Sequence, residues 1–531
     1  LSDGNLKVSM STTVGDGIRA TMRCGGKIYF EVEIDSIATN SGSFIGIATS
    51  NHDLSVEAKG SGNRDAFVGI NSFDSNLCGF ISGSNFDASY GGLGNNFGTA
   101  GKYLMFAVDI DAGKFWGGYD GTWFNSGNPA AGSNDSGKNL SLYDGWMPAI
   151  SRVGSAGSEV FIFNFGTSSF AHTPPTGFVS LNSANLTKPA HQGCDAFQSV
   201  TYSGNGSARA ITTDIAPAWV WIKNRSQADE HKLVDIVRGV QKELSSDDAS
   251  NAEQTDSNGV TAFGSSSFSL GSGANGYNDN TENFIAWCWE AGTAFSNDAS
   301  ATSIGTLDSS GRVNASDSLS IISYTGNATS GASIKHGLSA APELVIHRER
   351  DNANGWIVGA TDVGYTKMLR LDTTDKETSD SAAWNDTAPT SSIITLGNGN
   401  GTNRDGGAMI CYAMRSVSGV CKVGVYEGNN SSDGPYISLG FACRWLLVKN
   451  VDTAGQDWRI YDSTLDAANP NIEFFKANAD AAQISSSGFD FLADGVKARD
   501  NNAGFNSAVT FAYVAFADIA SGAGLAPIYG R

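Results

Sequence analysis

Basic residues are scarce in this sequence, and charged residues of either sign are few. The 531 residues include 34 Lys and Arg against 54 Asp and Glu, so the formal net charge is −20, and only 17% of residues are charged. Proteins that bind nucleic acid or an anionic membrane surface present clustered Lys and Arg side chains. Because the sequence has no such cluster, we expect neither nucleic acid nor a membrane surface as a partner.

Long hydrophobic runs are also missing. No apolar stretch reaches the ~18 residues that a membrane-spanning helix requires, and no basic segment followed by an apolar one opens the chain as a signal peptide would. We therefore expect no membrane insertion. The first residue is Leu1 rather than Met, so we expect that either a leading segment is removed or an upstream part, which could serve as an anchor, precedes this chain.

Cysteine and histidine occur without the spacing of metal ligands or catalytic groups. The seven cysteines form no C-x-x-C pair, and the six histidines form no H-E-x-x-H motif. Zinc sites, disulfide frameworks and G-x-S-x-G nucleophile elbows have recognisable spacings. Their absence predicts a protein that is not an enzyme, with no catalytic residues, no cofactor, no metal, and few or no disulfides.

Two weaker motifs have simple structural interpretations. The segment 271–276 matches G-x-G-x-x-G, but its Ser- and Asn-rich flanks, with no crossover helix after them, indicate a loop. Asp109, Asp111 and Gly113 resemble part of a calcium loop, yet the bidentate Glu of a complete loop is missing. A hairpin turn is the preferred interpretation of that segment.

Glycine is abundant, at 64 residues, alongside many Ser, Asn, Thr and Asp. Gly and Asn supply the positive φ values that tight turns need, so many short strands and few long helices are predicted. With 40% hydrophobic and 10% aromatic residues, the chain can still form packed cores. Its length predicts several domains.

Alternation of apolar and polar residues marks the first 180 residues. In 27–34 the side chains of Ile28, Phe30, Val32 and Ile34 share one face, which is the pattern of a half-buried strand. Further strands are expected at 44–48, 103–110 and 160–166. Gly, Asn and Ser clusters separate them, as in a β-sandwich.

These segments carry a resemblance to a known family. Residues 26–32 resemble the opening strand of a SPRY domain, 45–48 its next core strand, and 108–116 its Asp-x-x-x-Gly-x-aromatic hairpin. Residues 164–166 and 175–178 are similar to its closing strand and tail. The resemblance implies a concanavalin-like sandwich of two antiparallel sheets that binds partners, usually proteins, through loops at one end.

The remainder of the chain repeats itself. The tetrapeptide Tyr202–Asn205 returns as Tyr324–Asn327 and Tyr426–Asn429, at intervals of more than 100 residues. Apolar strands follow each copy, and a period of this length indicates tandem domains rather than a solenoid. We predict an all-β protein, a SPRY-like jelly-roll sandwich followed by three mutually related β-sandwich domains, at 1–185, 190–305, 306–418 and 419–531.

One segment of the first repeat is ambiguous. Residues 231–244 could form an amphipathic helix, with Leu233, Ile236, Val237, Val240 and Leu244 on one face. The corresponding segments of the other repeats, 367–371 and 471–475, alternate with a period of two. We therefore predict strand rather than helix.

Loop aromatics are the best candidates for ligand recognition. Trp116, Tyr119, Trp123 and Phe124 lie in or beside a polar, Gly-rich stretch. Aromatic faces stack on sugar rings, and neighbouring Asn and Asp bind the hydroxyls. The alternative is that Trp116 and Trp123 fill the sandwich core.

The repeats are similar to modules that accompany SPRY domains in virion proteins of bacteriophages, especially marine phages. The resemblance implies a tail or head fibre or similar appendage, on the virion surface after assembly in the host cytoplasm. Its partners would be other virion proteins, through the upstream segment, and a glycan or protein of the host surface. We expect a homo-oligomer, with a trimer as first choice. The alternatives are a cellular or secreted lectin or adhesin and, less favoured, a glycan-cleaving enzyme with a carboxylate pair.

Overall fold

The computed structural model describes residues 6–10, 17–20, 22–37, 42–49, 66–71, 77–81, 84–88, 99–142, 145–152, 157–182, 185, 193–273, 275–290, 292–492 and 494–517. These residues divide into two compact units, one of the residues up to 188 together with Leu492–Asp494 and the other of the remainder from 189 onward. Strands account for 47% of the chain and helices for 5%, which confirms the all-β prediction. No helix in the described ranges is long and apolar enough to cross a membrane.

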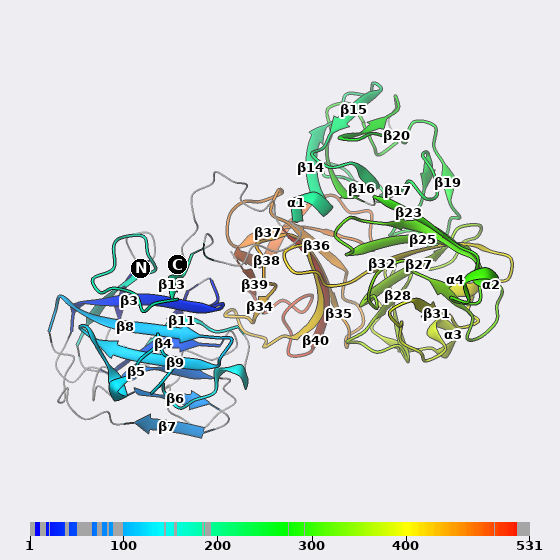
Figure 1. Ribbon diagram of the computed structural model, residues 1–531. Coiled ribbons are helices and arrows are strands. Elements are labelled where there is room, and N and C mark those ends of the chain that lie inside the picture. The colour runs from blue at the N-terminus through cyan, green and yellow to red at the C-terminus, as the bar shows by residue number, and fades with distance from the viewer. Residues whose placement is uncertain are drawn as a thin grey trace. The chain divides into compact units, whose positions relative to one another are not determined.

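The first unit contains two antiparallel sheets (Figure 1). One has the order β1 (Lys7–Met10), β12 (Glu159–Asn164), β3 (Lys27–Ser36), β8 (Lys102–Asp109), β9 (Lys114–Tyr119) and β10 (Thr122–Trp123), with β13 (Val179–Ser180) parallel to β3. The other has the order β2 (Gly17–Arg19), β11 (Met147–Arg152), β4 (Ser43–Ala48), β5 (Phe67–Asn71), β6 (Leu77–Ile81) and β7 (Ser84–Ala88). Two short 3-10 helices, η1 (Phe124–Ser126) and η2 (Leu140–Leu142), follow β10.

The core of this unit lies between its two sheets. The predicted face of β3, with Ile28, Phe30, Val32 and Ile34, is fully buried there against residues of the opposite sheet. The turn after β8 pairs Asp109 with Lys114, and the Ala112 N–H donates to Asp109 Oδ1 (3.0 Å). The hairpin interpretation of this segment is therefore confirmed.

The second unit contains three modules, each built around one large sheet. The main sheet of module 1 has the order β14 (Phe197–Ser203), β22 (Asn283–Glu290), β16 (Pro217–Asn224) and β17 (Lys232–Asp235). A smaller sheet has the order β15 (Arg209–Thr212), β21 (Ser267–Leu270) and β20 (Val260–Phe263). The module also contains the helix α1 (Gly193–Ala196) and the strand pair β18 (Lys242–Glu243) and β19 (Gln254–Thr255).

Module 2 has the largest number of short helices. Its sheet runs β23 (Thr293–Asn297), β24 (Ser309–Val313), β25 (Leu319–Thr325), β32 (Ala408–Met414), β27 (Leu344–Glu349), β28 (Ile357–Ala360), β29 (Lys367–Arg370) and β30 (Thr378–Ser379), beside the pair β26 (Ser333–Lys335) and β31 (Ile393–Thr395) and the helices α2 (Ala299–Thr302), α3 (Ser381–Trp384) and α4 (Asn400–Asn403). The predicted boundary at residue 305 assigns β23 to the first repeat, but β23 forms a hairpin with β24 and so joins the second sheet.

Module 3 is a single sheet in the order β33 (Cys421–Glu427), β40 (Thr510–Ala517), β35 (Cys443–Asn450), β36 (Arg459–Asp462), β37 (Asn471–Lys476), β38 (Ile484–Leu492), β39 (Gly495–Ala498) and β34 (Tyr436–Ser438). Residues 186–192 and 518–531, where predicted domains begin or end, lie outside the described residues.

The three modules share one strand order. In each, the strand that carries the repeated tyrosine pairs with the last strand of the module. That last strand pairs with a first inner strand (β16, β27 or β35), which pairs in turn with a second inner strand (β17, β28 or β36). Tyr202 lies opposite Phe284, Tyr324 opposite Met409, and Tyr426 opposite Phe511. The tyrosines therefore occupy one equivalent position, as the repeat predicts.

The inner strands carry apolar side chains on both faces because both of their faces are buried. In β16, Val220 and Ile222 point into the core of module 1, whereas Trp219 and Trp221 join a second core. That second core also takes residues from the inner strands of modules 2 and 3. Strands covered on both faces read as continuous apolar runs rather than alternating ones. We call this shared cluster the central core.

The ambiguous segment 231–244 contains strands and no helix. β17 ends at Asp235, a turn follows, and β18 begins at Lys242; the Leu233 N–H and the Leu244 carbonyl pair across them (2.9 Å). The strand prediction is confirmed.

Buried cysteines are found in both units. Cys24, Cys78, Cys288, Cys411, Cys421 and Cys443 are all buried. Burial raises the pKa of the Cys24 thiol to about 12. These thiols pack as small apolar side chains.

Candidate functional site

The predicted aromatic site in the first unit divides into buried and accessible residues. Trp116 is buried, donates from Nε1 to the Ser133 carbonyl (2.9 Å) and packs edge-on against Phe178. Phe124 is buried in the sandwich core. Trp116 belongs to a separate small cluster with Tyr29 and Phe178, against which Trp123 also packs, rather than to the sandwich core. Tyr119 and Trp123 are partly exposed, and they stay the candidates for stacking on a ligand.

The same turn follows each of the three repeated tyrosines of the chain. The hydroxyl of Tyr426 donates to the Phe505 carbonyl (2.6 Å), and the Asn429 N–H donates to Oδ1 of buried Asn506 (2.9 Å). A Cβ on Gly428 would lie 2.0 Å from the Ser507 carbonyl oxygen, so only glycine fits at this position. The same contacts recur in the other modules with Asn278 and Asn403 in place of Asn506.

Each module extends a loop onto another module, and these contacts close a ring. One backbone N–H in each loop donates to the carbonyl that follows the first inner strand of the neighbour: Glu253 to Arg350 (2.8 Å), Glu377 to Val451 (2.8 Å), and Gln483 to Arg225 (3.1 Å). We call the three boundaries the 1–2, 2–3 and 3–1 seams. Identical contacts repeated head to tail give a closed ring when the rotation between units closes.

A second equivalent contact crosses each seam from the residue at the start of the second inner strand. In two seams a tryptophan Nε1 donates to a carbonyl of the other module, Trp356 to Ser245 (2.7 Å) and Trp458 to Arg370 (2.7 Å). In the 3–1 seam the same place belongs to His231, whose Nε2 lies 3.0 Å from the Lys476 carbonyl.

A third position, at the end of the second inner strand, differs between seams. Asp235 accepts a hydrogen bond from Tyr412 across the 1–2 seam (2.7 Å) and pairs with fully buried Arg238. Asp462 accepts from Trp287 across the 3–1 seam (2.9 Å), and burial raises the pKa of its carboxyl. In the 2–3 seam the position is held by Ala360.

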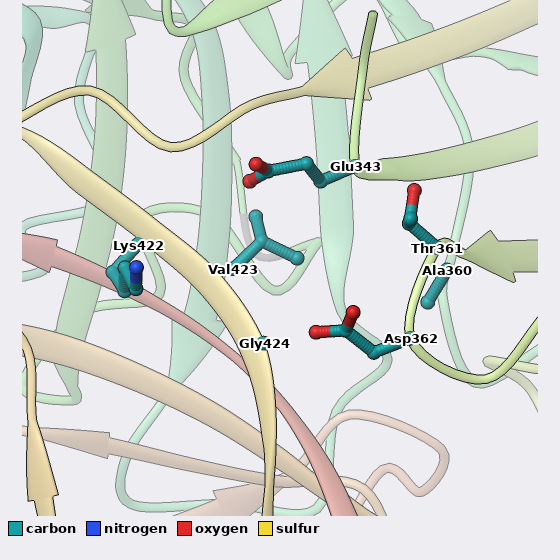
Figure 2. Close-up of a pocket in the computed structure, with 7 residues that line it drawn as sticks. All are labelled: Glu343, Ala360, Thr361, Asp362, Lys422, Val423 and Gly424. Atoms are coloured by element: carbon teal, nitrogen blue, oxygen red, sulfur yellow. The ribbon is translucent and has the colours of Figure 1, made fainter. Parts of the chain in front are cut away.

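This small residue lies at a pocket in the 2–3 seam. The pocket has a volume of about 170 Å³ and is lined by Glu343, Ala360, Thr361 and Asp362 from module 2 and Lys422, Val423 and Gly424 from module 3. Figure 2 shows the carboxylates of Glu343 and Asp362 on the side opposite the strand that carries Val423 and Gly424.

The chemistry of this pocket is limited. The Glu343 carboxylate already accepts hydrogen bonds from the N–H (2.8 Å) and the hydroxyl of Ser416. No aromatic ring lines the pocket, so it lacks the stacking surface of a sugar site. The space suits a few water molecules or a small polar group, and it gives no support to the glycan-cleaving alternative.

One group of carboxylates in module 1 has oxygens close enough for a shared cation. Asp229, Asp279 and Glu282 bring one oxygen each within 4.8 Å of the others. The Asn224 amide donates to Asp229 (2.6 Å) and to Glu282, and the Gly276 N–H donates to Asp279 (2.8 Å). These internal donors account for the grouping, and we assign it no metal.

The sequence reasoning missed the seams. It found the strands that carry them, but not that one face of each would pack against the other modules. A signal was present, because aligning the repeats on their inner strands places His231, Trp356 and Trp458 together just before equivalent strands.

The chain is thus an all-β protein that combines a two-sheet unit with a unit of three related modules. Residues 192–519 match the family described as a domain of unknown function, DUF7483. Because the match covers more than half of the chain, the chain belongs to this family, and the matched range takes in all three modules. No curated protein matches the sequence.

Proposed function

We propose that this chain is a non-enzymatic structural and binding component of a bacteriophage particle, a tail or head fibre or similar appendage. It would lie on the virion surface, after assembly in the host cytoplasm, and contact a glycan or protein of the host. The resemblance of residues 15–180 to SPRY domains supports a binding role. Its partners on the particle would be other virion proteins.

The ring of modules is the observation that carries the proposal. Three β modules closed around one buried core form a scaffold in which Asp235 and Asp462, at two of the seams, accept internal hydrogen bonds. Such a scaffold suits rigid display of surface loops rather than chemistry at a cleft. Weak loop-borne sites gain avidity when several copies are linked, so a homo-oligomer, trimeric by first choice, fits this role.

Peptide mass spectrometry of gradient-purified particles tests the proposal. We expect peptides of this chain in the particle fraction, at a constant ratio to a major structural protein across the peak. Peptides confined to the cell envelope or the medium of uninfected cells would contradict it and favour the lectin or adhesin alternative. Light scattering of the purified full chain would give the number of copies.

A further inference from the structure

The 3–1 seam differs from the other two in how the chain crosses it. Modules 1 and 2 are consecutive, as are modules 2 and 3, whereas modules 3 and 1 are the last and the first in the ring. Non-covalent contacts alone hold the 3–1 seam closed. Opening it would expose the aromatic central core, in which Phe197 of module 1 stacks on Phe516 of module 3 at 5.2 Å.

The 3–1 seam is also the one where the equivalent donor can change its charge. His231 is fully buried; its Nδ1 accepts from Trp221 Nε1 (2.8 Å), which places the ring proton on Nε2, facing the Lys476 carbonyl (3.0 Å). In the neutral imidazole, both ring nitrogens therefore take part in hydrogen bonds. Trp356 and Trp458 make the equivalent contact with an indole N–H that does not titrate.

The charges around His231 come from both modules. On its own side, Asp247 Oδ1 accepts from the His231 N–H (3.0 Å), and buried Lys223 lies close enough to disfavour a second positive charge. From module 3, the carbonyls of Lys476 and Asp480 face this cluster, and Asp480 accepts from Lys223 Nζ (2.9 Å). The Asp229 carbonyl also accepts a hydrogen bond from Lys223 Nζ (2.7 Å).

We propose that His231 is an acid-sensitive latch on the 3–1 seam, whose protonation opens the ring between its last and first modules. A proton on Nδ1 removes the acceptor for the Trp221 indole and points two N–H groups at each other. It also buries an imidazolium beside Lys223. Opening the seam relieves both conflicts because water then solvates the imidazolium.

The direction of the pH effect follows from the burial of the imidazole. Burial lowers the pKa of His231 to about 4, with Lys223 contributing in the same direction and Asp247 opposing it. A solvated histidine has a pKa near 6.5, so the latch is fully closed above that pH and weakens as pH falls toward 4. Between pH 7.5 and 5, linkage gives an increase in the opening constant of about 30-fold.

Hydrogen exchange of the full chain, followed by mass spectrometry, reads each seam separately. The N–H of Gln483 reports the 3–1 seam, and those of Glu253 and Glu377 report the 1–2 and 2–3 seams as matched controls in the same molecule. After correction for intrinsic rates, we expect protection at Gln483 to fall between pH 7.5 and 5 by about 30-fold more than at the two controls. An equal change at all three amides would overturn the proposal.

Two variants test the role of the imidazole itself. His231→Gln keeps a donor for the Lys476 carbonyl without a titrating group, and the double variant Trp221→Leu/His231→Trp installs the pair that module 3 carries at Leu447 and Trp458. Both should remove the excess acid sensitivity of the Gln483 amide. Persistence of that excess in a folded variant would refute the latch, and if neither variant folds, the three-seam comparison in the unmodified chain decides alone.

Discussion

The residue at the end of the second inner strand changes from seam to seam, and the residues facing it change with it. Asp235 meets Tyr412, Asp462 meets Trp287, and Ala360 replaces the acid where the 2–3 seam pocket forms. A buried carboxylate is tolerated only where donors are aimed at it. Polar contacts at two seams and a small apolar residue at the third are thus alternative solutions at one position.

Asp235→Ala should be strongly destabilising because it leaves Arg238 buried with Glu253 as its remaining carboxylate partner. Losing one partner of a buried pair costs about 3–5 kcal/mol. The double variant Asp235→Ala/Arg238→Val reproduces the residues of module 2, Ala360 and Val363, and should recover most of the loss. Urea unfolding of both variants measures this, and a double variant less stable than the single one would contradict it.

At the scale of elements, the strands and the repeat could be predicted from the sequence. So could the formation of strands rather than a helix in 231–244. Period-two alternation and the repeated tyrosine tetrapeptide depend on local residues alone. The central core was not predictable, because a run such as 219–222 is equally apolar on both faces and its composition cannot say what covers each face. For the same reason the buried positions of Trp116 and Phe124 could not be separated from the accessible Tyr119 and Trp123.

The turn after each repeated tyrosine depends on one buried amide. Asn506 accepts from the Asn429 N–H and donates to the carbonyls of Ser431 (2.7 Å) and Asp500 (2.8 Å). Asn506→Ala would leave these three groups unsatisfied, so we expect a loss of about 3 kcal/mol in the free energy of unfolding.

Denaturant unfolding of the full chain checks this value. Asn501→Ala, at an exposed position nearby, is the matched control and should change the stability by less than about 0.5 kcal/mol. Equal effects of the two substitutions would mean that the amide does not hold the turn.

At the scale of the whole second unit, the central core couples the three modules. Trp445 of module 3 lies 5.6 Å from Trp289 and 6.1 Å from Phe197, both in module 1. Trp219 of module 1 stacks on Tyr412 of module 2 at 4.3 Å. Modules that share a core cannot unfold one at a time without exposing the aromatic faces of the others, so the ring should unfold as one cooperative unit.

Trp445→Ala tests this coupling, because it removes a side chain from one module that contacts another. Removing a buried tryptophan costs about 3–5 kcal/mol, which in a unit of this size lowers Tm by on the order of 5 °C. If the ring is cooperative, calorimetry should show the whole transition shifting together. Exchange protection in β22 and β32 should then fall along with that in β40. If instead a separate transition for module 3 appeared while β22 and β32 kept their protection, the modules would be independent domains. Val240→Ala, at a position 39% exposed in module 1, is the control and should leave both readouts unchanged.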